Sequence, residues 1–259
     1  LADESSLAEP LQGMDPEHVF SVRSRLEVRL AKSLQESLLQ CCAMLAAAST
    51  GMSASAQAHR RLLLRCMHLL CAADPSHFEL ARSRYETATC LSDRLSALTC
   101  LVHGINADAQ PELDDFAGRF RDVPTVMDKW FAVQATRPTL DAVEQVGSLC
   151  GHPAFNWDNP NKIYSLLGGF ALRNPRAFHR FDGAGYRLVA DAILRLDSTM
   201  PQVAARLAGA FAPWQRLEPV RKELMRAELQ RLQSTLSISV DLADIVSRSL
   251  GMNDPDRKT

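Results

Sequence analysis

Apolar side chains recur every three to four residues along most of this chain, which is the spacing of one face of an α-helix. The first such stripe follows Asp15-Pro16 and consists of Val19, Val22, Leu26, Leu30, Leu34 and Leu38. No window of the sequence shows the period-two alternation of β-branched residues that marks a β-strand. The pattern therefore predicts an all-α protein.

Prolines preceded by Asp or Asn divide the chain into helices. Four such pairs are Asp15-Pro16, Asp74-Pro75, Asn159-Pro160 and Asn174-Pro175. In each pair the first side chain can accept a hydrogen bond from a free backbone amide, and proline suits the first helical turn. We expect helices over residues 15–48, with a break near Ser33 or Gln40, and over 55–72, 74–88, 92–103, 108–121, 124–136, 138–150, 159–172, 175–181, 186–196, 198–211, 220–235 and 239–250.

Helices of about 10–18 residues with short connections are typical of stacked antiparallel helix pairs. The predicted fold class is therefore an all-α superhelix, or α-solenoid, of the armadillo/HEAT-like kind. We expect a flexible lead-in over residues 1–14, a single superhelical domain over 15–252, and a polar tail over 253–259. The turn-rich segment 151–158 is the candidate internal boundary. Such a stack curves and leaves a concave face for a partner.

Composition removes several functional classes. Hydrophobic residues make up 46% of the chain and its formal net charge is −1, which argues against disorder and against binding to nucleic acid. No apolar run is long enough for a membrane span, and the first residues lack the pattern of a signal peptide. The seven cysteines are an odd number within helical patterns, which predicts free thiols and a reducing, cytoplasmic location.

The sequence contains no recognisable catalytic motif. It lacks His-Glu-x-x-His, Gly-x-Ser-x-Gly, a phosphate-binding glycine loop and a dinucleotide fingerprint. Its seven histidines do not pair with Cys, Asp or Glu at metal-ligand spacing. Basic and acidic residues alternate over 216–231, which favours an exposed helix face over a nucleic-acid stripe. The residues by themselves thus predict a helical domain without an active site.

Several short blocks occur in the order found in one known family. They are 92–98 (SDRLSAL), 126–135 (VMDKWFAVQA), 152–155 (HPAF), 159–162 (NPNK), 174–175 (NP), 178–179 (FH), 182–186 (DGAGY) and 201–207 (PQVAARL). Through these blocks the chain resembles the C-terminal helical domain of the zinc aminopeptidases of the aminopeptidase N (alanyl aminopeptidase) type. The similarity extends over about residues 60–250.

The resemblance implies a non-catalytic domain of a larger zinc-dependent metallopeptidase, which removes N-terminal amino acids from peptides. In that family the helical domain closes over the catalytic domain, encloses the active-site chamber and lines the route by which peptides enter. The implied partners are the parent's own catalytic domain and a peptide substrate, with no nucleic acid and no membrane. Zinc and its ligands belong to the catalytic domain, so the resemblance implies no catalytic residue, metal or cofactor in this chain and no activity of the chain alone.

The family places arginines of this domain near the far end of the bound peptide. Arg206, in the block 201–207, matches one of them, and a guanidinium can bind a peptide carboxylate bidentately. The alternative role for Arg206 is a salt bridge between helices. Tyr164 stands where the family has a second arginine. Tyr164 could offer a hydroxyl or a stacking surface there, and Lys162 could supply charge.

Two other functions compete with this interpretation. A free-standing helical-repeat scaffold would bind a protein partner on its concave face. A nucleic-acid binder would show salt-sensitive binding to oligonucleotides, and the near-neutral charge disfavours it.

Overall fold

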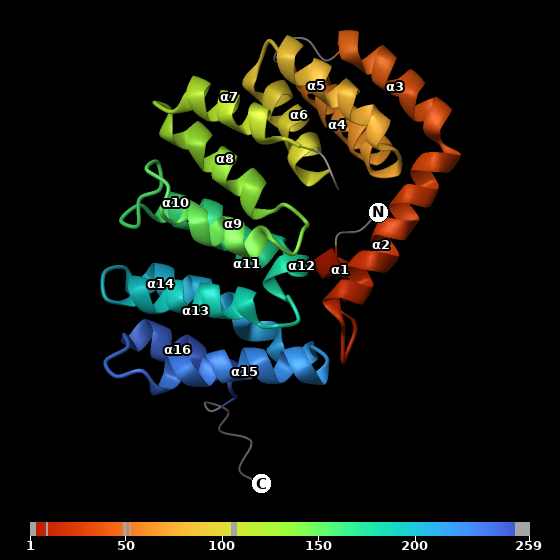
Figure 1. Cartoon of the computed structure of the whole chain (residues 1–259). Coiled ribbons are helices and arrows are strands. Elements are labelled where there is room, and N and C mark those ends of the chain that lie inside the picture. The colour runs from red at the N-terminus through yellow and green to blue at the C-terminus, as the bar shows by residue number, and fades with distance from the viewer. Residues whose placement is uncertain (1–3, 9, 49–50, 52, 105–107, 252–259) are drawn as a thin grey trace. The chain divides into compact units, whose positions relative to one another are not determined.

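The computed structural model describes residues 4–8, 10–48, 51, 53–104 and 108–251. All regular elements within these ranges are helical (Figure 1). The α-helices are α1 (Glu4–Ala8), α2 (Pro16–Ser33), α3 (Gln35–Ala48), α4 (Ala54–Ala73), α5 (Phe78–Thr87), α6 (Leu91–His103), α7 (Gln110–Phe120), α8 (Pro124–Ala135), α9 (Ala142–Leu149), α10 (Pro160–Ile163), α11 (Gly169–Arg173), α12 (Pro175–Phe178), α13 (Ala184–Asp197), α14 (Pro201–Ala208), α15 (Pro219–Ser234) and α16 (Val240–Ser249). Pro75–His77 and Gly209–Arg216 are 3-10 helical, and Tyr164–Gly168 is π-helical. The prediction of an all-α fold is confirmed.

The predicted helix starts carry the expected caps. The side chains of Asp15, Asp74, Asn159 and Asn174 accept hydrogen bonds from the amides of Glu17, Ser76, Asn161 and Ala177, at 2.9, 2.8, 2.9 and 3.2 Å. The break expected near Ser33 is also present, because α2 ends at Ser33 and α3 begins at Gln35. These features depend on a few neighbouring residues, which is why the sequence predicts them well.

Three segments are less regular than predicted. The helix expected over 138–150 begins only at Ala142, whose amide donates to the Thr139 carbonyl at 3.2 Å in a preceding turn. The helix expected over 159–172 is widened by the π-helical segment. The helix expected over 198–211 tightens into a 3-10 segment after Ala208, and Pro213 within it has no amide hydrogen to donate.

The chain divides into two compact units: residues 1–20 together with 134–259 form the first unit, and residues 21–133 form the second. In the first unit α13 packs against α14, and α15 against α16; in the second unit α3 packs against α4, and α5 against α6 (Figure 1). These neighbours are consecutive helices, as stacked pairs require. The candidate boundary at 151–158 lies inside the first unit, and the single domain over 15–252 stays a prediction.

The end of the predicted lead-in is attached to the first unit. The amide of Met14 donates to the Arg216 carbonyl at 2.9 Å, and the Glu218 amide donates to the Met14 carbonyl at 3.0 Å. This isolated bridge pairs residue 14 with the turn that precedes α15. The tail predicted over 253–259 falls outside the described residues.

Phe178 lies at the centre of the core of the first unit. Its ring makes edge-to-face contacts with Phe170, Tyr186 and Phe211 at centroid distances of 6.1, 5.2 and 5.8 Å. All four side chains are at most 1% exposed. Aromatic side chains bury large areas and favour this geometry, so the cluster joins α11, α12, α13 and the 3-10 segment that follows α14.

The turn 182–186 is shaped by two glycines with different roles. Gly183 has a φ of +70°, a left-handed conformation that glycine adopts without a steric cost. A Cβ on Gly185 would lie only 2.8 Å from the Ala177 carbonyl oxygen, so this position lets α13 approach α12 closely. The motif that contributes to the family resemblance therefore has a structural explanation.

Helices α6, α7 and α8 contribute large side chains to the core of the second unit. Phe116, Phe131, Leu98 and Leu101 are fully buried. The indole nitrogen of Trp130 donates to the Leu113 carbonyl at 3.0 Å and joins α8 to α7. All seven cysteines of the chain are free thiols, and Cys42, Cys66, Cys71 and Cys100 are buried.

Candidate functional site

Arg206 lies on the exposed face of α14, a short helix that begins at Pro201. Val203, Ala204, Leu207 and Ala208 form its buried face, so the amphipathic pattern turns Arg206 towards solvent. Arg206 is therefore an exposed cation on a helix that is firmly packed against α13 and α16.

Tyr164 provides the ring beneath this cation. The guanidinium carbon of Arg206 lies over the Tyr164 ring, 4.8 Å from its centroid, within the range of a cation–π contact. Within the described residues, neither side chain forms a hydrogen bond or an ion pair. The structure thus brings together two of the three predicted site residues, although they lie far apart in the sequence.

Lys162 differs from both of these residues. Lys162 lies on α10, just before the π-helical segment that begins at Tyr164, and only 5% of it is exposed. Burial of an ammonium is costly unless the group has partners, so this environment favours a structural role for Lys162. Its predicted contribution of charge to a binding site stays a prediction.

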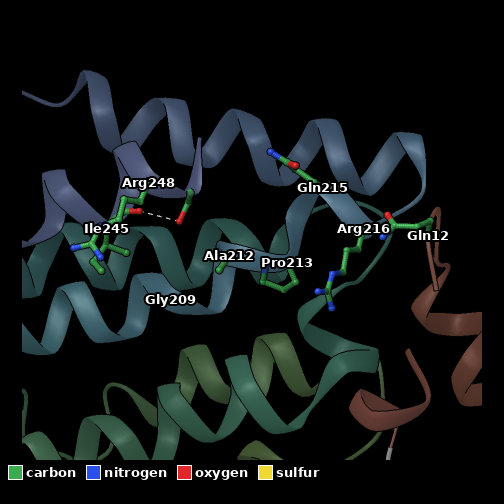
Figure 2. A pocket seen from close by; sticks show the side chains of 9 residues that line it. Gln12, Gly209, Ala212, Pro213, Gln215, Arg216, Ile245 and Arg248 are labelled. Atoms are coloured by element: carbon green, nitrogen blue, oxygen red, sulfur yellow. Dashed lines mark hydrogen bonds between the residues drawn. The ribbon is translucent and has the colours of Figure 1, made fainter. Parts of the chain in front are cut away.

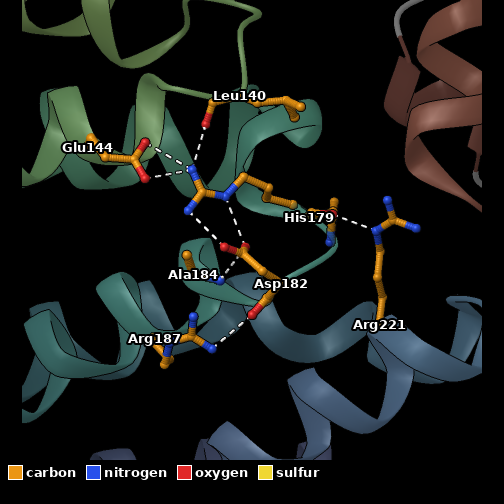
Figure 3. Close-up of polar contacts among 8 residues, drawn as sticks. Leu140, Glu144, His179, Asp182, Ala184, Arg187 and Arg221 are labelled. Atoms are coloured by element: carbon orange, nitrogen blue, oxygen red, sulfur yellow. Dashed lines mark hydrogen bonds and ion pairs between the residues drawn. The ribbon is translucent and has the colours of Figure 1, made fainter.

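Arg180, in the same unit, differs from Arg206 because its guanidinium is occupied by several hydrogen-bond partners. Arg180 bonds to Glu144 at 2.7 Å, to Asp182 at 2.9 Å and to the Leu140 carbonyl at 3.1 Å (Figure 3). Its hydrogen bonds, first of all that to Asp182, raise the pKa of Arg180, while the Arg180 guanidinium lowers the pKa of the Asp182 carboxyl. Arg180 thus joins the segment before α9 to the turn before α13, which is a structural role.

His179 is also structural, despite its place in a family motif. Its Nδ1 lies 2.8 Å from the Tyr186 hydroxyl. Its carbonyl accepts a hydrogen bond from Arg221 Nε at 2.5 Å (Figure 3). Burial lowers the pKa of His179 to about 3, and the Arg221 charge adds to this effect. His179 is therefore a neutral core residue without access to a substrate.

A surface pocket of about 560 Å³ lies between the 3-10 segment after α14 and the end of α16 (Figure 2). Its lining is mostly small or uncharged, with Gly209, Ala212, Pro213 and Ile245 among the residues. Arg248 at its edge forms an ion pair with Asp244, and the Ser249 hydroxyl donates to the Ile245 carbonyl at 2.8 Å. These interactions are internal to α16, so they stabilise the end of that helix.

The donor groups of the described residues do not fit a metal centre. Within these ranges no group of three or more His, Cys, Asp and Glu side chains is arranged to hold a metal ion. A zinc site built from these residues is therefore not supported. Every helix in the described part of the chain is also too short or too polar to traverse a lipid bilayer.

The fold and the site define an all-helical repeat domain with an exposed arginine stacked on tyrosine. Residues 1–251 match the family described as "Domain of unknown function (DUF3458_C) ARM repeats", and the chain belongs to this family. The prediction of an armadillo-like repeat fold is thereby confirmed.

Curated relatives carry the name aminopeptidase N. The chain is 32% identical to the protein of Haemophilus influenzae, covering 96% of this chain and 29% of that protein. It is 34% identical to the Caulobacter vibrioides protein, covering 97% of this chain and again 29% of the relative. The chain thus spans less than a third of the length of these relatives. The predicted resemblance to the C-terminal helical domain of aminopeptidase N is confirmed.

A solved structure agrees with these relatives. The crystal structure of Legionella pneumophila aminopeptidase A in complex with aspartic acid matches 97% of this chain and 31% of that protein, with a TM-score of 0.89 and 28% sequence identity. The helical arrangement of this chain is therefore found inside a much longer aminopeptidase.

Proposed function

We propose that this chain is the non-catalytic C-terminal domain of a zinc metallo-aminopeptidase that removes N-terminal amino acids from peptides. The observation that carries the proposal is the identity of 32–34% over 96–97% of this chain to proteins named aminopeptidase N, of which it covers only 29%. In this role the domain caps the active-site chamber and lines the peptide entry route. Its partners are the parent's catalytic domain and the peptide.

The zinc of such an enzyme would be held by residues outside this chain. Zinc supplies an activated water for peptide-bond hydrolysis when it is bound in an enzyme of this kind. This chain's own contribution is to bind and orient the peptide. The free thiols of all seven cysteines support a reducing, cytoplasmic location.

Arg206 is the residue through which the domain contacts the peptide. Its exposed guanidinium carries a permanent charge and uses none of its N–H donors within the described residues. A peptide with a free C-terminal carboxylate presents the complementary anion, and the two groups can form a bidentate, charge-assisted pair.

The test uses the whole aminopeptidase that carries this chain, with Arg206→Ala. We expect kcat/KM to fall about 10- to 150-fold on a short peptide with a free carboxylate, which corresponds to about 1.5–3 kcal/mol for a lost charge-assisted bond. A neutral aminoacyl arylamide should be hydrolysed at the unchanged rate. The matched control is Arg195→Ala, because Arg195 is also exposed and stacked on a ring, 4.0 Å from the centroid of Trp157.

Two results would contradict the proposal. Equal losses on both substrates, or equal effects of the Arg206 and Arg195 variants, would make Arg206 a structural residue. Peptidase activity of the purified 259-residue chain, with stoichiometric tightly bound zinc, would overturn the assignment of a non-catalytic domain and should be measured in parallel.

A further inference from the structure

We infer that Tyr164 is a positioning residue, which holds the Arg206 guanidinium ready for the substrate carboxylate without neutralising it. This inference rests on the proposed function of Arg206. The observation behind it is the contact of 4.8 Å between the guanidinium carbon and the ring centroid, made by an arginine that has no ion-pair partner within the described residues.

The type of contact leaves the arginine able to bind an anion. A carboxylate partner would occupy the N–H donors and cancel the charge, as Glu144 and Asp182 do for Arg180. An aromatic ring attracts the cation through its π face and takes no N–H donor. Tyr164 therefore restricts the long, flexible Arg206 side chain while the edge of the guanidinium stays available.

Restriction of this side chain should increase affinity. A free arginine loses rotamer entropy when it binds a ligand, and a side chain already held in place loses less. The phenol ring adds no positive charge of its own, so the pair presents the one positive charge of the Arg206 guanidinium. Its electrostatic preference is therefore for a single carboxylate.

The backbone around Tyr164 explains how its ring is held. Tyr164 opens the π-helical segment, in which the Gly169 amide donates to the Tyr164 carbonyl. Segments of π-helix are rare in proteins, and those that do occur are frequently located at functional sites. A Cβ on Gly168 would lie 3.7 Å from Tyr164 Cδ1, so the glycine backbone runs beside the ring. Tyr164 is half-buried, which further limits the rotation of its side chain.

Kinetics of the whole enzyme test the role of the ring. For Tyr164→Leu we expect KM for a free-carboxylate peptide to rise about two- to five-fold, the size of an exposed cation–π contact. The kcat on this peptide and the kinetics on a neutral arylamide should not change. Tyr164→Phe keeps the ring and should restore the wild-type KM. In an Arg206→Ala background, Tyr164→Leu should have no further effect, because Tyr164 acts through Arg206.

The outcomes separate the inference from the function on which it rests. If Arg206→Ala is selective for the carboxylate substrate but Tyr164→Leu is silent, the positioning role fails and the proposed function stands. If Arg206→Ala shows no selectivity, the proposed function itself fails. A loss in Tyr164→Phe equal to that in Tyr164→Leu would assign the effect to the hydroxyl and overturn the positioning role.

A spectroscopic measurement on the 259-residue chain tests the contact without any activity. The Arg206 side-chain protons should show an upfield ring-current shift in the NMR spectrum of the wild type and of Tyr164→Phe. This shift should disappear in Tyr164→Leu. Identical Arg206 shifts in all three proteins would show that the ring does not hold the guanidinium, and would overturn the inference.

Discussion

The backbone of Gly185 lies directly against the carbonyl groups of Ala177 and Phe178, so closely that only a residue without a side chain fits there. A Cβ at this position would be 2.8 Å from the Ala177 oxygen. Backbone atoms cannot yield as a flexible side chain can. This one contact sets the separation of α12 and α13 in the first unit.

We therefore expect Gly185→Ala to destabilise the chain by about 1–3 kcal/mol or more, as overpacking does. The matched control is Gly168→Ala. Gly168 has a helical φ of −65°, and its added Cβ would make only ordinary contacts at 3.7–4.0 Å. This control should be neutral or stabilise the chain by about 0.4–1 kcal/mol. Urea unfolding of the 259-residue chain measures both, and equal midpoints would disprove the explanation.

His179 should make the stability of the chain depend on pH. Burial first, and the Arg221 charge second, lower its folded-state pKa to about 3, against 6.5 for the ordinary group. Between pH 3 and pH 6.5 the unfolded chain therefore binds a proton at His179 that the folded chain does not bind. The contribution of the neutral His179 ring to the free energy of unfolding is complete above pH 6.5 and is lost as the pH falls towards 3.

As the pH falls from 6.5 to 5.0, this proton binding lowers the free energy of unfolding by about 1.5–2 kcal/mol. We expect His179→Asn to lose this part of the pH slope, whatever its stability at pH 7.5. Urea unfolding at the two pH values provides the measurement. His152→Asn is the control, because burial lowers the pKa of His152 too, but this side chain is only half-buried and its share of the slope should be smaller. An unchanged slope in His179→Asn would contradict the buried, neutral state of the ring.

Asp197 should hold the start of α16 in place. Its carboxylate accepts hydrogen bonds from the Ser239 amide at 2.7 Å and from the Ser239 hydroxyl at 2.5 Å, and Asp197 is 7% exposed. Loss of these bonds leaves partly buried donors unsatisfied, which costs about 1–3 kcal/mol. Asp197→Ala should therefore lower stability by this amount and increase hydrogen exchange at the start of α16.

The matched control for this prediction is Asp191→Ala on the same helix. Asp191 pairs with Arg231 at 2.7 Å, but both side chains are exposed to solvent, and such pairs contribute about 0–1 kcal/mol. If Asp191→Ala loosened α16 as much as Asp197→Ala, the role of the buried carboxylate would be refuted.

The buried thiols of the second unit should react slowly in the folded chain. Burial, with smaller effects of neighbouring thiols, raises the pKa of Cys42 to about 12 and that of Cys66 to about 11. Since the thiolate is the nucleophile, alkylation by iodoacetamide at pH 8 should be much slower at Cys42 and Cys66 than at the half-buried Cys90. Mass spectrometry of labelled peptides gives the rates, and urea should abolish the difference. Equal native rates would contradict the predicted protection.

Periodicity predicted helices better than it predicted their buried faces. Val22, Leu26 and Leu34 belong to the first apolar stripe, yet they are 44%, 44% and 47% exposed. Ala31, which is less hydrophobic, is fully buried. A periodic stripe shows that a helix is favoured, whereas burial depends on which helices pack against it.

The site was predictable only in part. Arg206 and Tyr164 were selected through the family resemblance, and their roles are proposals that the Arg206 and Tyr164 variants test. Nothing in the order of residues indicated that the two side chains touch, because α14 and the π-helical segment are separated by α11, α12 and α13. Periodicity also did not predict the π-helical segment Tyr164–Gly168, because its residues continue the helical pattern of the preceding turn.

By itself the sequence determined the all-helical class, the helix starts at Asp-Pro and Asn-Pro, and the family resemblance. The helical class and the helix starts depend on hydrogen bonds and side-chain spacing within a few residues, so they can be read locally. Tertiary structure alone decided that Tyr164 lies under Arg206, that Lys162 is buried, and that Gly185 must lack a side chain. The physical reason is that such contacts join segments distant in the chain, and their distances are set by how whole helices pack.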